Sequence, residues 1–171
     1  MPAKQQKKSG SQTGGNTSFP LSGFHFRVDF LFSKKNESKY TGPVEAAFQE
    51  VSGLKGTMDI QTYAEMGFNA QPKGLPTGEI YENLVLKRGM IKDNKLFQWF
   101  EDALQYKQTL HVPVLITALH TESTEKGTPA LRWLAYDAFP ISYEVGGFDA
   151  MASGLLIETL ELRYAYFVRF K

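Results

Sequence analysis

The side chains that most often carry metal or nucleophilic chemistry are few in this sequence and stand apart from one another. The three histidines, His25, His111 and His120, are not paired with each other at the i+2 or i+4 spacing typical of metal ligands. Ser52 and Ser153 each precede a glycine, and no G-x-S-x-G motif surrounds either of them. Cysteine is absent, which excludes disulfides, thiolate zinc sites and cysteine nucleophiles. We therefore expect neither a metal site nor an acyl-transfer site.

Two pairs of carboxylates could in principle act as a general acid and a general base. Glu101 and Asp102 are adjacent in a helical pattern, so their side chains point in different directions on its solvated face. Glu158 and Glu161 are three residues apart in a strand pattern, which places them on opposite faces of a sheet. Neither pair is arranged for glycoside hydrolysis.

Phosphate chemistry is also poorly supported. Gly74 and Gly78 belong to neither a P-loop nor a G-x-G-x-x-G motif. Lys87 and Arg88 form a small basic cluster at the end of a strand. We interpret this cluster as an exposed strand terminus or an inter-subunit salt bridge, with phosphate contact as the weaker alternative. The sequence thus predicts no catalytic residues, no cofactor and no enzymatic activity.

Composition is that of one globular domain preceded by a polar tail. The chain has 171 residues, 42% of them hydrophobic, and a formal net charge of +1, which argues against a dedicated nucleic-acid-binding protein. Residues 1–18 have little to bury and are expected to be flexible, or to order on a neighbouring subunit, while residues 19–171 form the domain. No apolar run reaches the ~20 residues of a membrane-spanning helix, and no Sec-type signal follows the N-terminal lysines. We expect cytoplasmic synthesis, without membrane insertion by this chain.

Period-two alternation predicts a mainly β fold. In the segment 24–32 the even positions are apolar, and the last segment, 156–170, alternates for so long that it must bend or span more than one packing environment. Residues 33–43 are expected to be a loop, and 66–79, with three glycines and two prolines, a long loop or an irregular extended arm. Pro140 is expected to end a strand. The other strands expected are 46–51, 57–65, 80–87, 112–118, 131–137 and 141–145.

One helix is expected, with Asp93 or Asn94 as its N-cap. Trp99 and Phe100 could stack on a ligand ring, but their helical spacing favours core packing. The stripe expected to be buried against a sheet is Leu96, Phe97, Trp99, Phe100, Ala103 and Leu104. These elements predict a β-barrel or β-sandwich with one flanking α-helix.

Five sequence blocks, in this order, resemble a known family. They are F-x-F-R-V at Phe24–Val28, F-Q-E-V-S-G-L at Phe48–Leu54, N-L-V-L-K-R-G at Asn83–Gly89, W-F-E-D-A-L at Trp99–Leu104 and I-E-T-L-E-L at Ile157–Leu162. Together they resemble the tail tube proteins of contractile phages and extracellular contractile injection systems, relatives of the haemolysin-coregulated protein of type VI secretion. The resemblance implies a structural subunit that forms stacked hexameric rings around a lumen that conducts cargo.

Two further expectations concern surfaces. We hypothesise that polar positions opposite an apolar face line the lumen, with an ordinary solvent face as the alternative; they are Asp59, Gln61, Thr159, Glu161 and Arg163. The loop 66–79 matches the family's arm that bridges subunits or rings, although its Lys73–Gly78 element departs from the family's Lys-Leu-Pro-Gly-like form. Its candidate contacts are Met66, Phe68, Lys73, Leu75 and Pro76.

The resemblance also implies partners. The outward helix face would meet a sheath protein through Lys95, Gln98, Glu101 and Asp102. Other implied partners are baseplate and tube-terminating proteins, with DNA or other cargo in the lumen of a virion or released particle. Two alternatives stay open: a tube-initiating ring near the baseplate, and a monomeric ligand-binding β-barrel.

Overall fold

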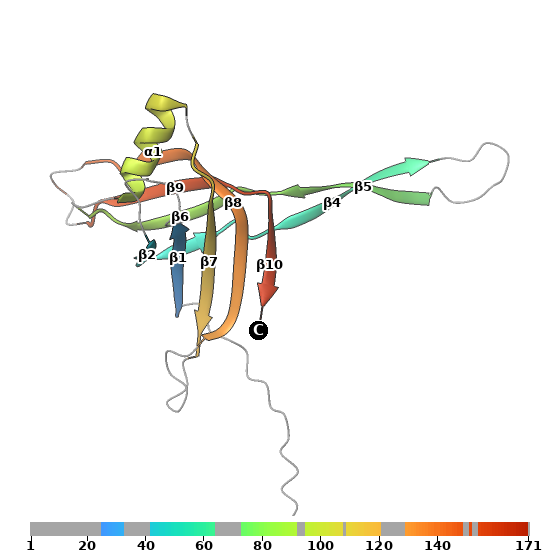
Figure 1. Cartoon of the computed structure of the whole chain (residues 1–171), viewed down its shortest axis with the longest axis horizontal. Helices are drawn as coiled ribbons and strands as arrows, with labels where there is room; N and C mark the ends of the chain where they lie inside the picture. Colours follow the sequence, from blue (N-terminus) through green and yellow to red (C-terminus); the bar gives the residue numbers. More distant parts are fainter. Residues whose placement is uncertain are drawn as a thin grey trace, which may run out of the picture.

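The computed structural model describes residues 25–32, 42–63, 73–91, 95–107, 109–120, 129–148, 151 and 154–170. The predicted flexible tail, the helix-cap pair at 93–94 and the arm residues 66 and 68 lie outside these ranges. The described part holds ten strands and one helix (Figure 1). Their bounds are β1 Phe26–Phe32, β2 Gly42–Ala46, β3 Glu50–Ser52, β4 Gly56–Tyr63, β5 Lys73–Tyr81, β6 Leu84–Gly89, α1 Lys95–Tyr106, β7 Val112–Leu119, β8 Pro129–Val145, β9 Ile157–Arg163 and β10 Tyr166–Phe170.

Eight strands form one bent sheet in the order β2-β1-β7-β8-β9-β6-β3, with β10 added beside β8. We call β2, β1, β7, the first half of β8 and β10 the first wing, and the second half of β8, β9, β6 and β3 the second wing (Figure 1). All pairings are antiparallel. The predicted fold class, mainly β with one flanking helix, is confirmed.

Strand β8 passes from one wing to the other, and it does not end at Pro140 as expected. Its first half pairs with β7 and β10, and its second half pairs with β9. Asp137 has a φ of 53° at the corner, in a region that Asp tolerates better than most residues. The register shifts between Pro140 and Ser142. The strand continues through Pro140 because the backbone N–H that proline lacks is tolerated where the hydrogen-bond ladder is irregular.

The C-terminal alternating segment bends, as one of the two expectations had it. The segment breaks at Tyr164–Ala165, so that β9 pairs within the second wing and β10 pairs within the first. The amide of Ala165 donates to the carbonyl oxygen of Tyr136 across 3.0 Å, which ties the bend to the corner of β8.

The core lies between the wings and under α1. Trp99 is buried, its ring lies edge-on to Phe30 and Phe32, and its indole nitrogen donates to the carbonyl oxygen of Leu110 across 3.1 Å. The buried hydrophobic cluster is Val28, Phe30, Phe32, Leu84, Leu86, Leu96, Trp99, Val112, Val114, Ile116, Ala135, Ala138, Leu160, Leu162 and Tyr164. Core packing of Trp99 is thereby confirmed.

The buried stripe of the helix is narrower than predicted. Phe97 keeps 40% of its surface exposed and Leu104 keeps 64%. Leu96 and Trp99 are the two fully buried side chains of α1, because the helix contacts the sheet along a single row of residues. Phe97 instead lies against Tyr143 of β8, with ring centroids 5.0 Å apart.

Three expected element boundaries are wrong. The segment 46–51 is not one strand, because β2 ends at Ala46 beside β1 and β3 begins at Glu50 beside β6. The segment 80–87 is interrupted at 82–83. The expected loop 66–79 includes most of β5, which pairs with β4 in a separate two-stranded sheet that we call the ribbon. Cross-strand pairing overrides the two glycines and the one proline in β5, since a ribbon has free edges on which a proline is tolerated.

Candidate assembly surfaces

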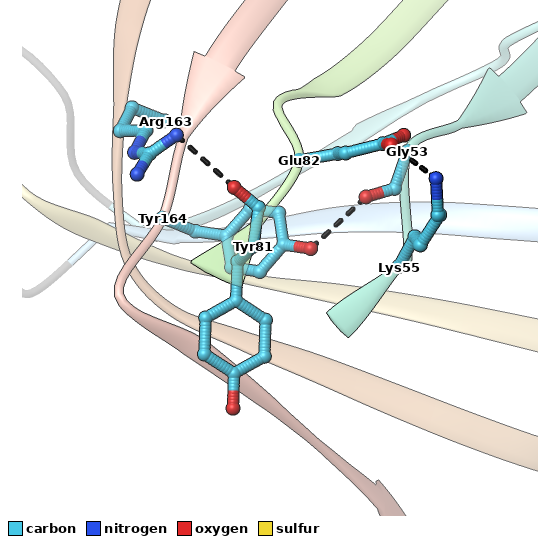
Figure 2. A network of polar contacts seen from close by, with 6 residues as sticks. All are labelled: Gly53, Lys55, Tyr81, Glu82, Arg163 and Tyr164. Carbon is cyan, nitrogen blue, oxygen red and sulfur yellow. Dashed lines mark hydrogen bonds and ion pairs between the residues drawn. The ribbon is translucent and has the colours of Figure 1, made fainter. Parts of the chain in front are cut away.

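The ribbon leaves the second wing through a root held by polar contacts (Figure 2). The hydroxyl of Tyr164 donates to the carbonyl oxygen of Gly53 across 2.9 Å. One terminal nitrogen of the Arg163 guanidinium donates to the carbonyl oxygen of Tyr81 across 3.1 Å. The Lys55 ammonium pairs with the Glu82 carboxylate, so both strands of the ribbon are fixed where they leave the body.

Gly53 is required by the geometry of this root. Its φ is 92°, in the left-handed region, and a Cβ built on it would lie 1.8 Å from the carbonyl oxygen of Asn83. The amide of Lys55 also donates to the carbonyl oxygen of Gly53 across 2.9 Å. This tight turn between β3 and β4 sets the direction in which the ribbon starts.

Three aromatic rings pack beneath the root. The centroids of Tyr81, Tyr164 and Phe167 are 5.8 to 6.2 Å apart. Burial raises the pKa of the Tyr164 hydroxyl above its ordinary value. The hydrogen bond to Glu79, 2.6 Å long, raises the pKa of Tyr81. These contacts stabilise the ribbon root and are not arranged for proton transfer to a substrate.

The register of the ribbon places Met58, Ile60 and Pro76 on one side, together with Glu79. Gly56 faces Tyr81, Met58 faces Glu79, and Ile60 faces Pro76 after a bulge. We call Met58, Ile60 and Pro76 the apolar ribbon face. Met58 is 61% exposed and Ile60 is 59% exposed, so this face has no cover within the protomer.

The other side of the ribbon carries Thr57, Asp59 and Gln61 on β4, opposite Ile80, Gly78 and Leu75 on β5. All the described side chains at 57–62 and 74–80 are exposed. The predicted alternation in β4 is therefore present, but neither side of this strand is buried in its own domain. Leu75 and Pro76, two of the expected arm contacts, lie on opposite sides of the ribbon because neighbouring strand residues point to opposite sides.

The outward side of the second wing is polar. Thr159, Glu161 and Arg163 alternate with the buried Leu160 and Leu162 of β9 and so share this side. Register adds the polar residues Glu50, Ser52, Lys87, Ser142 and Glu144, and with them the half-buried Val85. We call this surface the polar sheet face.

The five residues predicted to line a lumen thus come from two elements. Thr159, Glu161 and Arg163 lie together on β9, while Asp59 and Gln61 lie on the ribbon, which is a separate two-stranded sheet. The ribbon side that includes Tyr81 packs against the buried Tyr164. Asp59 and Gln61 are on the opposite ribbon side, away from that core contact.

The outward side of α1 is only partly as expected. Lys95 and Glu101 are exposed, whereas Gln98 and Asp102 are half-buried. Glu101 accepts a hydrogen bond from Gln105 across 3.3 Å. The helix therefore offers a mixed-charge strip beside the exposed Phe97.

Sequence reasoning missed a buried polar cluster. Glu158 is 2% exposed and accepts hydrogen bonds from Arg88 and from the hydroxyl of Tyr143. The expectation of an exposed basic strand end is wrong for Arg88, which points inward with Leu84 and Leu86. Alternation along β6 could have revealed this, because Arg88 is two residues beyond Leu86.

Lys87 follows the opposite pattern to Arg88. It points outward and pairs with Glu50 of β3 across 3.1 Å. Within the described ranges, no three His, Asp or Glu side chains gather as a metal site requires. The helix in the described part is not long and apolar enough to cross a membrane.

The space between the wings is largely filled. A cavity of about 310 Å³ lies at its open end, where Phe26 and Trp133 of the first wing approach Val51 of β3 and Leu54 just beyond it. The cavity is open to solvent on one side and has Glu50 in its lining.

The comparison with protein families decides what these surfaces belong to. The family model of the T4-like virus tail tube protein gp19 matches residues 22–168. The chain belongs to this tail tube protein family. None of the curated protein sequences compared with it matches.

Solved structures agree. One chain in the cryo-EM structure of the anti-feeding prophage (AFP) baseplate, 6-fold symmetrised, is 30% identical with a TM-score of 0.79, over 90% of this chain and 97% of that chain. A chain in the sheath-tube complex of the extracellular contractile injection system PVC is 20% identical with a TM-score of 0.73, over 95% and 99% of the two chains. An Hcp protein is 15% identical with a TM-score of 0.55, over 84% and 90%.

The tail tube protein described here is a structural subunit of a phage tail or contractile injection apparatus. The resemblance that the five sequence blocks indicated is confirmed. Its important residues are therefore to be sought on the surfaces just described, rather than in a catalytic cleft.

Proposed function

We propose that six copies of this tail tube protein close into a ring and that the rings stack into a tube. The observation that carries this proposal is the ribbon, which is held firmly at its root and exposed along both sides. Such a projection gains little free energy within one protomer, because its apolar side chains have nothing to bury against. The 6-fold symmetrised assembly that contains the 30% identical chain supports a hexameric ring.

Ring closure would use the edges of the sheet. β2 and β3 end the eight-stranded order, and β10 is paired only with β8. An open strand edge presents unpaired backbone groups and invites association. Pairing with the next copy around a closed ring satisfies these groups and leaves no free lateral edge.

The lumen would be lined by the polar sheet face. Thr159, Glu161 and Arg163 would face the passage from β9, with Asp59 and Gln61 continuing it along the ribbon. A polar surface lets cargo slide past, since burial of apolar area against the wall would retain it. Charges of both signs lie on this face, so its polarity alone does not select DNA over protein cargo.

The outer contacts follow from the same arrangement. Leu75, Pro76 and Lys73 of the ribbon, with Met66 and Phe68 of the segment between β4 and β5 in the sequence, would bridge to neighbouring copies. The outward side of α1, with Lys95, Gln98, Glu101 and Asp102, would meet a sheath protein. Assembly in the cytoplasm, with baseplate and tube-terminating partners, would precede release in a particle. The subunit would perform no catalysis.

Negative-stain microscopy of the purified protein tests the ring. Rings or tubes are expected, together with a mass six times that of the 19.3 kDa chain in gel filtration. A monomer at high protein concentration would contradict the proposal and would favour a monomeric β-barrel.

The lumen assignment has its own experiment. Because the chain has no cysteine, a single Glu161→Cys variant can be labelled selectively. In assembled tubes, we expect it to react with a small maleimide and to resist a maleimide carried by a bulky protein. The matched control is Lys95→Cys on α1, which should react with both. Equal reaction of both variants with the bulky reagent would place Glu161 outside the lumen.

A second candidate is a tube-initiating ring near the baseplate. It is favoured by one observation, that the 30% identical chain comes from a baseplate structure, while the chain from a sheath-tube complex is 20% identical. A bulk subunit should form long tubes by itself. An initiating ring should instead stop at single rings and elongate only when a second tube protein is added.

A further inference from the structure

The two ends of the core differ in how they are closed. At one end α1 lies over the sheet, with Trp99 edge-on to Phe30 and Phe32 of β1. The other end lies at Phe26, where β1 begins, about 13 Å from Phe30 at the usual rise of a strand. In Figure 1 α1 lies above the first wing, and β1 begins at its lower end. The described part of the chain thus closes one end of the core with a helix and leaves the cavity of about 310 Å³ at the other.

The lining of this cavity is mostly apolar. Six of its eight lining residues are apolar; Phe26 and Trp133 line it from the first wing, and Val51 and Leu54 face them from the second. An open apolar cavity leaves surface in water that a docked apolar segment would cover. A cavity of about 150 Å³ accepts one benzene-sized ring, so this one has room for about two aromatic side chains.

The register of β1 leads the preceding chain to the mouth of the cavity. Phe26 pairs with Ala118, and both residues line the cavity. The ladder continues one residue before Phe26, because the amide of Leu119 donates to the carbonyl oxygen of His25 across 2.9 Å. Side chains alternate between the two sides of a strand, so the next position on the cavity side before Phe26 is that of Phe24.

The segment just before His25 has the apolar side chains that the cavity needs. Phe19-Pro20-Leu21-Ser22-Gly23-Phe24 contains two phenylalanines and a leucine, whereas residues 1–18 contain Met1 as their one large apolar side chain. Six residues span at most about 20 Å, and packed sheets lie about 10 Å apart, so the segment is long enough to cross from β1 to the second wing. Attachment to β1 gives it an effective concentration of about millimolar, which favours it over a free ligand.

We propose that the segment Phe19–Phe24 docks into the cavity of its own subunit and closes the open end of the core. Phe24 lies beside Phe26, and Phe19 covers Val51 and Leu54 on the opposite wall. The docked segment connects β1 to β3, the strand that ends the second wing, and so stabilises an edge of the sheet. This docking takes place within a single subunit and does not depend on the ring proposed above.

Tryptophan fluorescence tests the docking. The chain has two tryptophans, and Trp99 is 1% exposed, so quenching by acrylamide reports mainly on Trp133 in the cavity. Phe24→Ala and a deletion of residues 1–24 should each increase the quenching, shift the emission to longer wavelength and lower the melting temperature by several degrees. A deletion of residues 1–18 is the matched control and should change none of the three. Phe148→Ala, at a position that is 84% exposed, controls for the loss of a ring elsewhere.

A peptide experiment tests the same contact without relying on the stability of a variant. A synthetic peptide of residues 17–25, added to the protein that lacks residues 1–24, should restore the protection of Trp133. The same peptide with Phe24→Ala should not restore it. Equal protection by the two peptides would overturn the assignment of Phe24 to the cavity.

Two further outcomes would overturn the docking. One is a protein without residues 1–24 whose Trp133 is quenched no more than in the natural protein. The other is protection of Trp133 that appears in the natural protein only as rising concentration brings copies together, because the segment would then fill a neighbour's cavity. Microscopy of the natural protein tests the ring separately, and a failure to form rings leaves the docking within one subunit unchanged.

Discussion

The hydroxyl of Tyr164 reaches the carbonyl oxygen of Gly53 across 2.9 Å, although 111 positions separate the two residues in the sequence. Tyr164 stands at the break between β9 and β10, and Gly53 stands at the turn into β4. One hydrogen bond thus links the bend of the C-terminal strands to the start of the ribbon. The orientation of the projecting element is determined by the same residues that shape the body.

Tyr164→Phe should loosen this link. Loss of the hydroxyl leaves the Gly53 carbonyl without its side-chain donor, and we expect the free energy of unfolding to fall by about 0.5–1.5 kcal/mol. Amide hydrogen exchange in β4 should become faster, because the ribbon root opens more often. Denaturant unfolding and hydrogen exchange, at one fixed protein concentration since assembly adds stability, measure both effects. Tyr166→Phe is the control, because Tyr166 is exposed; an equal effect there would show that the link is unimportant.

The same tyrosine predicts a dependence on alkaline pH. Burial raises the pKa of Tyr164 in the folded state, while in the unfolded chain it should return to about 10. Above that pH the unfolded state loses its proton first, so the folded state binds more protons and the free energy of unfolding falls as pH rises. The contribution of Tyr164 is complete below about pH 10 and is lost above it. The stability difference between the natural protein and Tyr164→Phe should therefore narrow between pH 9 and 11; a difference that widens would contradict this sign.

We expect Gly53→Ala to destabilise the folded protein strongly. The added Cβ would collide with the Asn83 carbonyl oxygen, and an alanine at a φ of 92° is strained by about 1–3 kcal/mol even without that collision. We expect a loss of several degrees in melting temperature, together with weaker ring formation. Gly78→Ala is the matched control, since a Cβ there meets nothing within 4 Å. If the two variants melt alike, the turn at Gly53 is not the constraint that we infer.

Alternation and helical spacing were sufficient to predict the class of the fold. Val28, Phe30 and Phe32 are buried as the period-two pattern of their strand required, and Trp99 is buried as its helical position required. The local sequence pattern predicts burial correctly at these positions because each of these side chains packs into its own domain. It fails at Pro140, because only the pairing with β9 shows that the strand continues.

The ribbon shows a second limit of prediction from local sequence patterns, after the one met at Pro140. Met58 and Ile60 alternate with Asp59 and Gln61 as in any half-buried strand, yet they are exposed. A sequence pattern reports that a side chain needs burial and does not report which molecule provides it. The root contacts of Tyr164 were equally hidden, since long-range hydrogen bonds leave no trace in local spacing.

The buried pair of Arg88 and Glu158 gives the last prediction. Arg88→Met removes the guanidinium that donates to the buried Glu158 carboxylate, to which the Tyr143 hydroxyl also donates, and removal of one partner of a buried pair costs about 3–5 kcal/mol. The double variant Arg88→Met/Glu158→Leu removes both charges and should recover much of that loss. Lys87→Met is the control: this neighbour pairs with Glu50 at the surface and should cost about 0–1 kcal/mol. Denaturant unfolding of the natural protein, the control, the double variant and the single variants Arg88→Met and Glu158→Leu measures the coupling. If the double variant loses the sum of both single losses, the two side chains act independently and the cluster is not a coupled unit.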